Sequence, residues 1–231
     1  TTWKGDFQLR DYELFSKLTD DEMMQIENAY TEIRVRKGDF IYFESQYLNK
    51  IYFIKEGYVK TGYIDSRGSD IIKEILHPGE IFGQFGTEQL HMNGEFAQVY
   101  KTNACVCVFN IDIFRKIMKQ NNKLALAFSE KVSKKLRRME SRFVNMLHAD
   151  VKTRLMRFFY DLLQSGKNPL PGNSVILDNY LTHCDVARMI GSTRQTVTSI
   201  FNEPEFRRLV HISKKQIIIP DINAVRKMSV L

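Results

Sequence analysis

The stretch T-H-C-D-V-A-R-M-I-G-S-T-R-Q-T-V-T-S-I-F-N, from Thr182 to Asn202, decides the fold of the second half of the chain. Its first residue is followed three positions later by Asp185, a capping-box pair that predicts the start of a helix. Gly191 stands where the chain must turn sharply, because glycine takes positive φ without steric penalty. The stretch therefore predicts two short helices joined by a tight turn.

The second of these helices has an apolar side and a polar side. Ser192 or Thr193 can cap it, and the apolar residues that would face inward are Val197, Ile200 and Phe201. The residues expected to face outward are Arg194, Gln195, Thr198, Ser199 and Asn202. No acidic residue occurs between Asp185 and Glu203. This layout is typical of a helix-turn-helix, whose second helix enters the major groove of DNA. An ordinary pair of core helices is the alternative, and the acid-free outer face favours DNA binding.

Phosphate contacts position a protein on DNA, whereas base contacts specify the sequence. Thr193 and Thr196, at the start of the second helix, are expected to bind phosphates with help from the helix dipole. Residues 209–219 predict a β-hairpin that would form the wing of a winged helix. Its tip carries Lys214 and Lys215, which would add a salt-dependent attraction to phosphates.

Charge is distributed unevenly over the 231 residues, whose net charge is +7. Residues 1–110 carry 12 Lys and Arg against 17 Asp and Glu, and residues 111–231 carry 22 against 10. An acidic front and a basic back suggest a sensing part joined to a part that meets phosphates. The sequence has no apolar run of 18 residues and a polar start, so we expect no membrane span, no signal peptide and a cytoplasmic location.

The first half of the chain changes to the pattern of short strands between Ile33 and Phe109. The expected strands are Phe40–Phe43, Ile51–Ile54, Tyr58–Ile64 and Ile71–Leu76. Turn signals separate them, and one of these is the pair Glu56-Gly57. Strands so short and evenly spaced predict a small barrel or roll, which is either purely structural or holds one small ligand.

A long helix is predicted from about Lys123 to Leu147. Its apolar residues recur every three or four positions, close to the spacing of a coiled-coil contact. We expect a homodimer contact, here called the dimer seam, made by Phe128, Val132, Leu136, Met139 and Phe143. A helix packed on its own roll would show a similar stripe, but the length and regularity favour the dimer.

Three segments carry a resemblance to a known family: K-G-D-F-I-Y-F-E at 37–44, I-Y-F-I-K-E-G-Y-V-K at 51–60 and H-P-G-E-I-F-G-Q-F-G at 77–86. They resemble the cyclic-nucleotide-binding β-roll of the Crp/Fnr regulators, and the resemblance extends over residues 12–222. It implies an α+β chain with an N-terminal, jelly-roll-like double-stranded β-roll, a long dimerisation helix and a C-terminal winged helix-turn-helix. The implied domains are 1–120, 121–148 and 149–231.

The resemblance also implies a function: a homodimeric transcriptional regulator on palindromic DNA, with RNA polymerase as a further partner if it activates. By the family's pattern the base contacts fall on Arg194, Gln195 and Ser199. Arg194 suits guanine and Gln195 suits adenine. Ser199 is too short to replace the arginine found there in cyclic-AMP-binding members, so the half-site should differ from theirs at two positions.

The implied effector pocket consists of Gly83, Gln84, Glu95, Phe96 and Ala97. It departs from the cyclic-AMP-binding members, because an acid and a phenyl ring stand where their Arg-Ser pair neutralises the cyclic phosphate. We therefore expect no cyclic AMP. An iron–sulfur cluster is also not expected, because no cysteine precedes Cys105. The effector is unknown, and a regulator without any ligand is equally permitted.

Several alternatives stay open at this point. One is a β-roll that recruits protein partners and carries a degenerate helix-turn-helix. An enzyme is disfavoured, because the sequence shows no nucleophile–base pair, phosphate-cradling loop or metal-ligand spacing. Cys105 and Cys107 share one face of a strand, and either core packing or a thiol switch would explain them.

Overall fold

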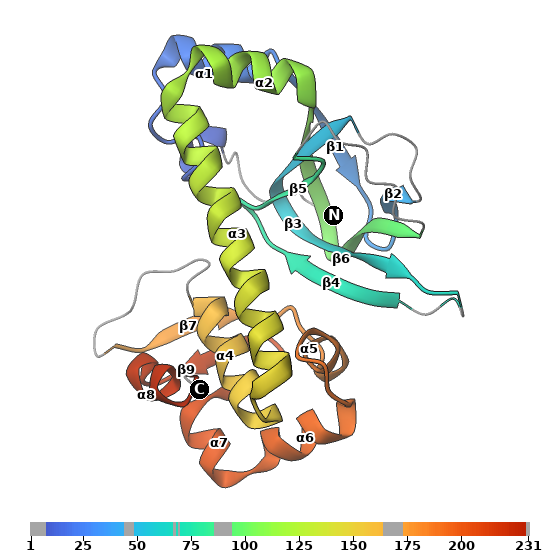
Figure 1. The fold of residues 1–231 in the computed structure, drawn as a ribbon, viewed down its shortest axis with the longest axis vertical. Helices are drawn as coiled ribbons and strands as arrows, with labels where there is room; N and C mark the ends of the chain where they lie inside the picture. Colours follow the sequence, from blue (N-terminus) through green and yellow to red (C-terminus); the bar gives the residue numbers. More distant parts are fainter. Residues whose placement is uncertain are drawn as a thin grey trace. The chain divides into compact units, whose positions relative to one another are not determined.

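The computed structural model describes residues 8–43, 49–66, 68, 70–85, 94–163 and 173–229. The chain divides into two compact units, Thr1–Ser133 and Lys134–Leu231. The division falls inside one long helix (Figure 1). The domain limits expected from the sequence, at 120/121 and 148/149, stay predictions.

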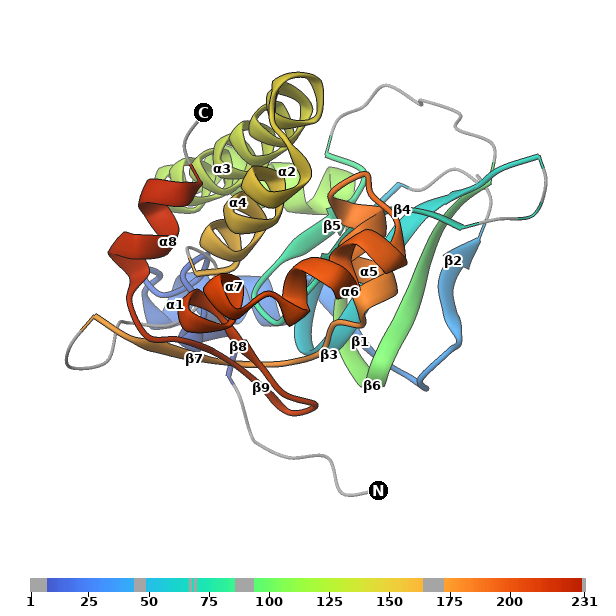
Figure 2. The same ribbon diagram turned by 90° about the horizontal axis from the view of Figure 1, so that it is seen from below.

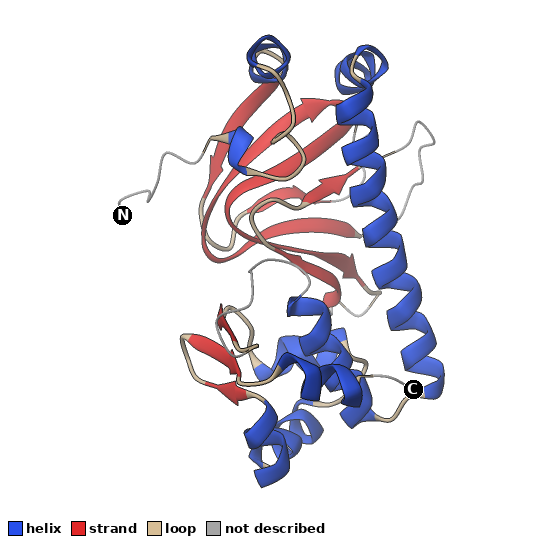
Figure 3. Ribbon diagram, turned by 90° about the vertical axis from the view of Figure 1, so that its left-hand side faces the viewer, coloured by secondary structure: helices blue, strands red, loops and turns tan. Residues whose placement is uncertain are grey.

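The N-terminal unit is an antiparallel roll that follows a short helical start. The elements before the roll are a 3-10 turn (Leu9–Asp11) and α1 (Asp20–Glu27). The strands are β1 (Tyr30–Val35), β2 (Phe40–Phe43), β3 (Lys50–Ile64), β4 (Asp70–Leu76), β5 (Ile81–Gly83) and β6 (Glu95–Asn110). They form one sheet in the order β1-β6-β3-β4, with β2 paired to β6 and β5 to β3. Figure 3 shows the strands curling into the roll.

Strand β3 corrects one expectation from the sequence. Glu56-Gly57 does not separate two strands, because β3 is continuous and its pairing with β6 shifts register around Glu56. Gly57 has φ +83°, and a Cβ there would lie 2.4 Å from the carbonyl oxygen of Asn103. The glycine therefore forms a bulge that lets one long strand bend while its neighbour passes close by.

Two groups of buried side chains fill the roll. One joins the helical start to the end of the sheet through the ring of Phe15, which packs edge-on against Phe53 and stacks on Phe109. The other lies deeper in the sheet, where the rings of Tyr52 and Phe82 stack with centroids 4.8 Å apart. Stacked aromatic rings bury large apolar areas, so they account for much of the stability of the roll.

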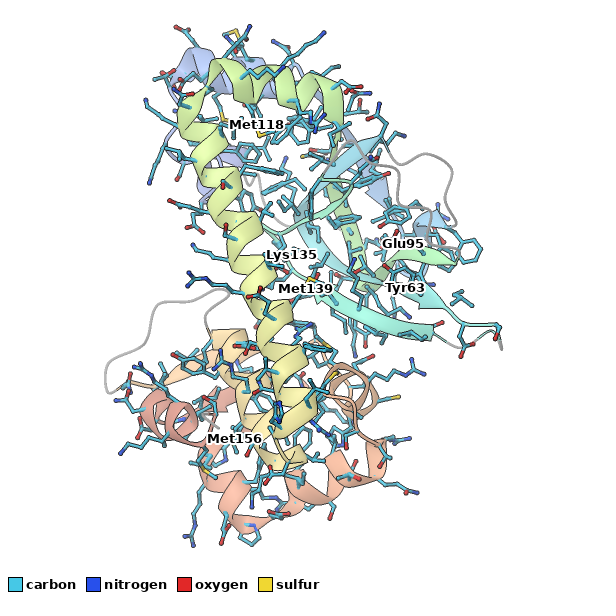
Figure 4. The ribbon with its side chains drawn as sticks, in the orientation of Figure 1. Tyr63, Glu95, Met118, Lys135, Met139 and Met156 are labelled. Atoms are coloured by element: carbon cyan, nitrogen blue, oxygen red, sulfur yellow. The ribbon has the colours of Figure 1, made fainter. Side chains whose placement is uncertain are left out.

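A single asparagine joins the two helices that follow the roll, α2 (Ile111–Gln120) and α3 (Asn122–His148). Asn121 ends α2 with its backbone N–H donating to Ile117, and its side-chain oxygen accepts from the N–H of Leu124 at 2.9 Å. Asn121 therefore ends one helix and caps the next. Figure 4 labels Met118 on α2, which packs against the first core group of the roll.

The C-terminal unit combines helices with a small sheet. Beyond the second half of α3, its elements are α4 (Val151–Leu163), β7 (Val175–Asp178), α5 (His183–Met189), α6 (Arg194–Asn202), α7 (Pro204–Leu209), β8 (His211–Ile212), β9 (Gln216–Ile219) and α8 (Ile222–Met228). The sheet has the order β7-β9-β8. Its core contains Met156 of α4 (labelled in Figure 4), Phe159, Phe206 and Val225, all at most 1% exposed. This is a winged helix, so the predicted α+β fold class is confirmed for the chain.

Candidate nucleic-acid interface

The helix-turn-helix begins with the capping box that the sequence predicts. The hydroxyl of Thr182 accepts from the N–H of Asp185 at 3.2 Å, and the carboxylate of Asp185 accepts from the N–H of Thr182 at 2.8 Å. The carboxylate also accepts from the Thr182 hydroxyl at 2.5 Å. These bonds satisfy backbone donors that a helix start leaves unpaired, and they fix the first residue of α5.

The turn between α5 and α6 has the predicted glycine, and an arginine outside the motif holds it. Gly191 has φ +65°, the left-handed conformation that other residues take only with strain. The guanidinium of Arg154, on α4, donates to the carbonyl of Gly191 at 3.2 Å and to that of Ala149 at 3.1 Å. Sequence reasoning missed Arg154, because nothing in a helical pattern shows which distant carbonyl a side chain reaches.

Thr193 is the N-terminal cap of helix α6, which resolves the choice between Ser192 and Thr193. The hydroxyl of Thr193 accepts from the N–H of Thr196 at 3.1 Å and also lies 2.9 Å from the Thr196 hydroxyl. The helix buries the predicted apolar side, which consists of Val197, Ile200 and Phe201. Its exposed residues include the predicted base readers Arg194, Gln195 and Ser199. The structure therefore brings these three side chains together on one open face of α6.

Thr198 does not face outward as expected from the sequence. It is half-buried, and its hydroxyl lies 2.9 Å from Nδ1 of His183 on α5. The imidazole also packs edge-on against Phe201, with ring centroids 4.7 Å apart. Helical periodicity put Thr198 on the outer face, but the first residue of α5 reaches over to it. His183 is a second interface residue that the sequence did not single out.

The end of α6 and the wing are held by further polar contacts. Arg207 of α7 donates to the side-chain oxygen of Asn202 at 2.7 Å and to the carbonyl of Phe201 at 3.3 Å. Asn179, which follows β7, contacts the hairpin turn: its side-chain amide donates to the carbonyl of Ser213 at 2.6 Å, and its backbone N–H donates to the carbonyl of Lys215. These contacts fix the β8–β9 turn, at which the predicted phosphate ligands Lys214 and Lys215 are both exposed.

Figure 2 shows α5 and α6 beside each other, with the hairpin of β8 and β9 nearby. An open pocket of about 360 Å³ lies between these elements. It is lined by His183, Phe201, Asn202, Arg207, Val210, His211, Ile212, Ser213 and Ile218. An exposed polar helix face, a basic hairpin tip and an open pocket that contains Arg207 thus occur together on the C-terminal unit. Such a surface is suited to a polyanion.

The predicted dimer seam separates into two parts. Phe128 and Val132 are half-buried and pack against the first core group of the roll. Leu136, Met139 and Phe143, in contrast, are 55%, 42% and 65% exposed (Met139 is labelled in Figure 4). Packing on the roll, the alternative reading of this stripe, therefore accounts for its first two residues only.

The opposite side of the second half of α3 is polar and turned inward. Asn145 is buried, and Arg138 and Arg142 lie near Asp161 of α4, which is also paired to Arg157 at 3.1 Å. Burial raises the pKa of Asp161, although the three arginines act in the opposite direction. The polar side of the helix is therefore used within the chain, whereas the apolar side is left exposed.

The predicted effector residues lie at two places along β3. Gly83 pairs with Ile51 near one end of this strand, and Gln84 follows it. Glu95, Phe96 and Ala97 pair with Tyr63, Gly62 and Thr61 near the other end (Tyr63 and Glu95 are labelled in Figure 4). Phe96 and Ala97 are fully buried. The segment between the two groups, residues 86–93, lies outside the described residues, and the pocket stays a prediction.

Strand β6 buries both Cys105 and Cys107. Burial, helped by the negative charge of Glu32, raises the pKa of each thiol to about 12. A thiol that keeps its proton is a poor nucleophile and is oxidised slowly. The geometry therefore favours core packing over a thiol switch.

Comparison with known proteins gives matches to both units. Residues 32–121 match the cyclic nucleotide-binding domain, and residues 153–228 match the Crp-like helix-turn-helix domain. The global nitrogen regulator of Synechococcus elongatus is 25% identical over 79% of this chain and 82% of its own. The anaerobic regulatory protein of Pasteurella multocida is 23% identical over 92% of this chain and 77% of its own.

Solved structures show the same fold. A CooA variant from Carboxydothermus hydrogenoformans aligns with a TM-score of 0.71 and 19% identity, covering 93% of this chain and 98% of that one. FixK2 from Bradyrhizobium japonicum aligns with a TM-score of 0.68 and 18% identity, covering 87% and 98%.

The fold and the exposed α6 face define a DNA-binding regulator that joins a cyclic-nucleotide-binding-like roll to a winged helix-turn-helix. Together with its relatives, this order of domains shows that the chain belongs to the Crp/Fnr family of transcriptional regulators. None of the helices that the structure describes is long and apolar enough to cross a membrane.

Proposed function

We propose that this regulator binds a palindromic DNA site as a homodimer and that Arg194, Gln195 and Ser199 of α6 read each half-site. The observation that carries the proposal is the open face of α6, on which these three side chains are exposed. Thr193 and Thr196 at the helix start, and Lys214 and Lys215 on the wing, would hold the DNA backbone on either side of this face.

The exposed apolar face of α3 supports the homodimer. Leu136, Met139 and Phe143 lie one helical turn apart, and all three are exposed in the single chain. Monomeric proteins seldom leave such a row of large apolar side chains in water. A second copy of the same helix would cover the row by a two-fold contact, since each face then meets its own equivalent. Two recognition helices related by this axis require a palindromic site.

Selection of bound duplexes from a random pool tests the proposed specificity. We expect two inverted half-sites about 10 base pairs apart, centre to centre. Each half-site should keep one guanine, for Arg194, and carry adenine where Gln195 reads. A pool that yields no preferred sequence, or the usual half-site of cyclic-AMP-binding members unchanged, would refute the proposed readout.

We further propose that cyclic AMP is not the effector. Glu95, next to the predicted phosphate position, would repel a cyclic phosphate, and the nearby cation Lys60 is already paired to Asp70 at 2.7 Å. Millimolar cyclic AMP should therefore leave the melting temperature and operator affinity unchanged. If the protein activates transcription, RNA polymerase is its further partner, and transcription in vitro from a template with the selected site would distinguish activation from repression.

A further inference from the structure

We propose that His183 is a phosphate ligand of the helix-turn-helix, and that DNA binding by this protein is coupled to proton uptake by the His183 imidazole. The proposal rests on the proposed DNA binding and goes beyond it, because it assigns a further contact and a pH dependence. It is based on the contacts of one imidazole and the charges of the pocket around it.

Two contacts hold the imidazole beside the reading face of α6. Its Nδ1 lies 2.9 Å from the hydroxyl of Thr198, and its ring packs edge-on against Phe201. Thr198 is one helical turn from both Arg194 and Asn202, which are exposed. Because Thr198 occupies Nδ1, the nitrogen left for a phosphate oxygen is Nε2. The side chain thus lies at the border between the base-reading face and the pocket formed with the wing.

The charged groups around the imidazole decide its protonation. Arg194 of α6 is close enough to act on it, and Arg207 of α7 and His211 of β8 line the same pocket. On its own helix, the carboxylate of Asp185 is turned back to Thr182. Burial and the charge of Arg194 together lower the pKa of His183. In the free protein the imidazole is therefore neutral at physiological pH.

A bound duplex reverses these conditions. A phosphate within hydrogen-bond distance of Nε2 favours the protonated form, and phosphates also offset the charge of Arg194. The protonated ring carries a hydrogen on each nitrogen, so Nδ1–H donates to Thr198 while Nε2–H donates to the phosphate. The pKa of His183 is therefore higher in the complex than in the free protein.

The sign of the pH dependence follows from this difference. His183 has one pKa in the free protein and a higher one in the complex. Above both values His183 is neutral in both states, and below both values it is protonated in both states. The affinity for DNA therefore changes with pH only between the two values. In that window the complex binds a proton that the free protein lacks, and affinity rises as the pH falls. One site per protomer gives at most about a tenfold change per pH unit.

Three variants of the full chain separate the two roles of His183. H183N keeps an amide near the Nδ1 position for Thr198 but cannot be protonated. H183R carries a permanent charge for the phosphate. H148N removes an exposed histidine at the end of α3, outside the helix-turn-helix and the pocket, and serves as the matched control. Affinity is measured from pH 6 to pH 8 at fixed ionic strength, with the selected operator and with a mixed-sequence duplex of the same length.

The expected result is a loss of pH dependence in two of the variants. Wild type and H148N should bind several-fold more tightly at pH 6 than at pH 8, H183N should show a flatter profile, and H183R should bind tightly at both. The slope of log affinity against log salt should steepen between pH 8 and pH 6 by about 0.9 per protomer in wild type, but not in H183N.

Equal pH profiles for wild type and H183N would overturn the proposal while leaving the proposed DNA binding intact. The same applies if H183R is no tighter than wild type at pH 8, a comparison that remains decisive should H183N fold poorly. If wild type bound neither duplex at any pH, the proposed function itself would fail, and this inference with it.

Discussion

At the scale of single residues, contacts between separate helices position the DNA-reading face. Arg154 bonds the carbonyls of Gly191 and Ala149, Arg207 bonds the end of α6, and His183 bonds Thr198. None of these contacts follows from periodicity. What the sequence could predict were the local features, namely the capping box, the glycine with positive φ and the buried side of α6. Each depends on neighbours a few positions away, whereas the missed contacts join separate helices.

Replacing Arg194 by alanine tests base reading directly. The variant R194A should lose roughly 1–3 kcal/mol of binding free energy on the selected operator and much less on random DNA, because a bidentate contact to one base is removed. The measurement is a titration of both duplexes at one salt concentration. R208A, on the exposed side of α7, is the matched control and should leave the ratio of the two affinities unchanged. An equal loss on both duplexes would make Arg194 a phosphate contact only.

The two buried cysteines of β6 should be chemically inert. With thiol pKa values of about 12, roughly one Cys105 or Cys107 in ten thousand is a thiolate at pH 8. Iodoacetamide should therefore modify the half-buried Cys184 first, as followed by mass spectrometry of the native protein. DNA binding should be the same with and without reductant. Rapid labelling of Cys105 or Cys107, or a redox-dependent affinity, would restore the thiol switch as an explanation.

At the scale of elements, predictions based on local sequence signals were confirmed, whereas those that depend on contacts distant in the sequence were not. The wing hairpin was predictable, because a short polar turn between two stretches of β-branched residues is a local signal. The bulge at Gly57 was mistaken for a turn, since a glycine with positive φ is common to both and only the close approach of Asn103 distinguishes them. The predicted seam on α3 divides into a packed part and an exposed part, which a uniform stripe of apolar residues cannot reveal.

The exposed part of α3 predicts how the proposed dimer can be broken. Phe143 is 65% exposed in the single chain, so F143D should barely change the stability of a monomer. In a dimer it removes a buried side chain worth about 1.5–3 kcal/mol from each copy and places two like charges near one axis. We expect dissociation to monomers in sedimentation experiments and at least a hundredfold loss of operator affinity.

The control for this experiment lies on the same helix. R137E changes an exposed charge outside the apolar row and should leave the dimer intact at moderate salt. If F143D remained dimeric, the seam would lie elsewhere, and the apolar face of α3 would need another explanation.

At the scale of the whole molecule, the charge asymmetry has a measurable consequence. If the wing lysines contact phosphates rather than bases, as proposed, the double variant K214Q/K215Q should weaken operator and random duplex equally and reduce the salt slope by about two per protomer. Titrations between low and moderate salt provide the slope. A loss confined to the operator would show that the wing reads the sequence. The acidic N-terminal half is not proposed to contact DNA, so substitutions of its surface lysines should leave the salt slope unchanged.

The helix α3 belongs to both compact units, and this affects how the protein can be taken apart. No loop separates the units, so a fragment that begins at Val151 would lack Asn145 and Met146, which line a pocket with the α4 residues Arg154 and Phe158. A fragment that contains only the C-terminal unit should therefore begin at or before residue 134, so that its N-terminus is the second half of α3. Aggregation of such a fragment would then reflect the exposed apolar residues Leu136, Met139 and Phe143 of α3 and would not indicate misfolding.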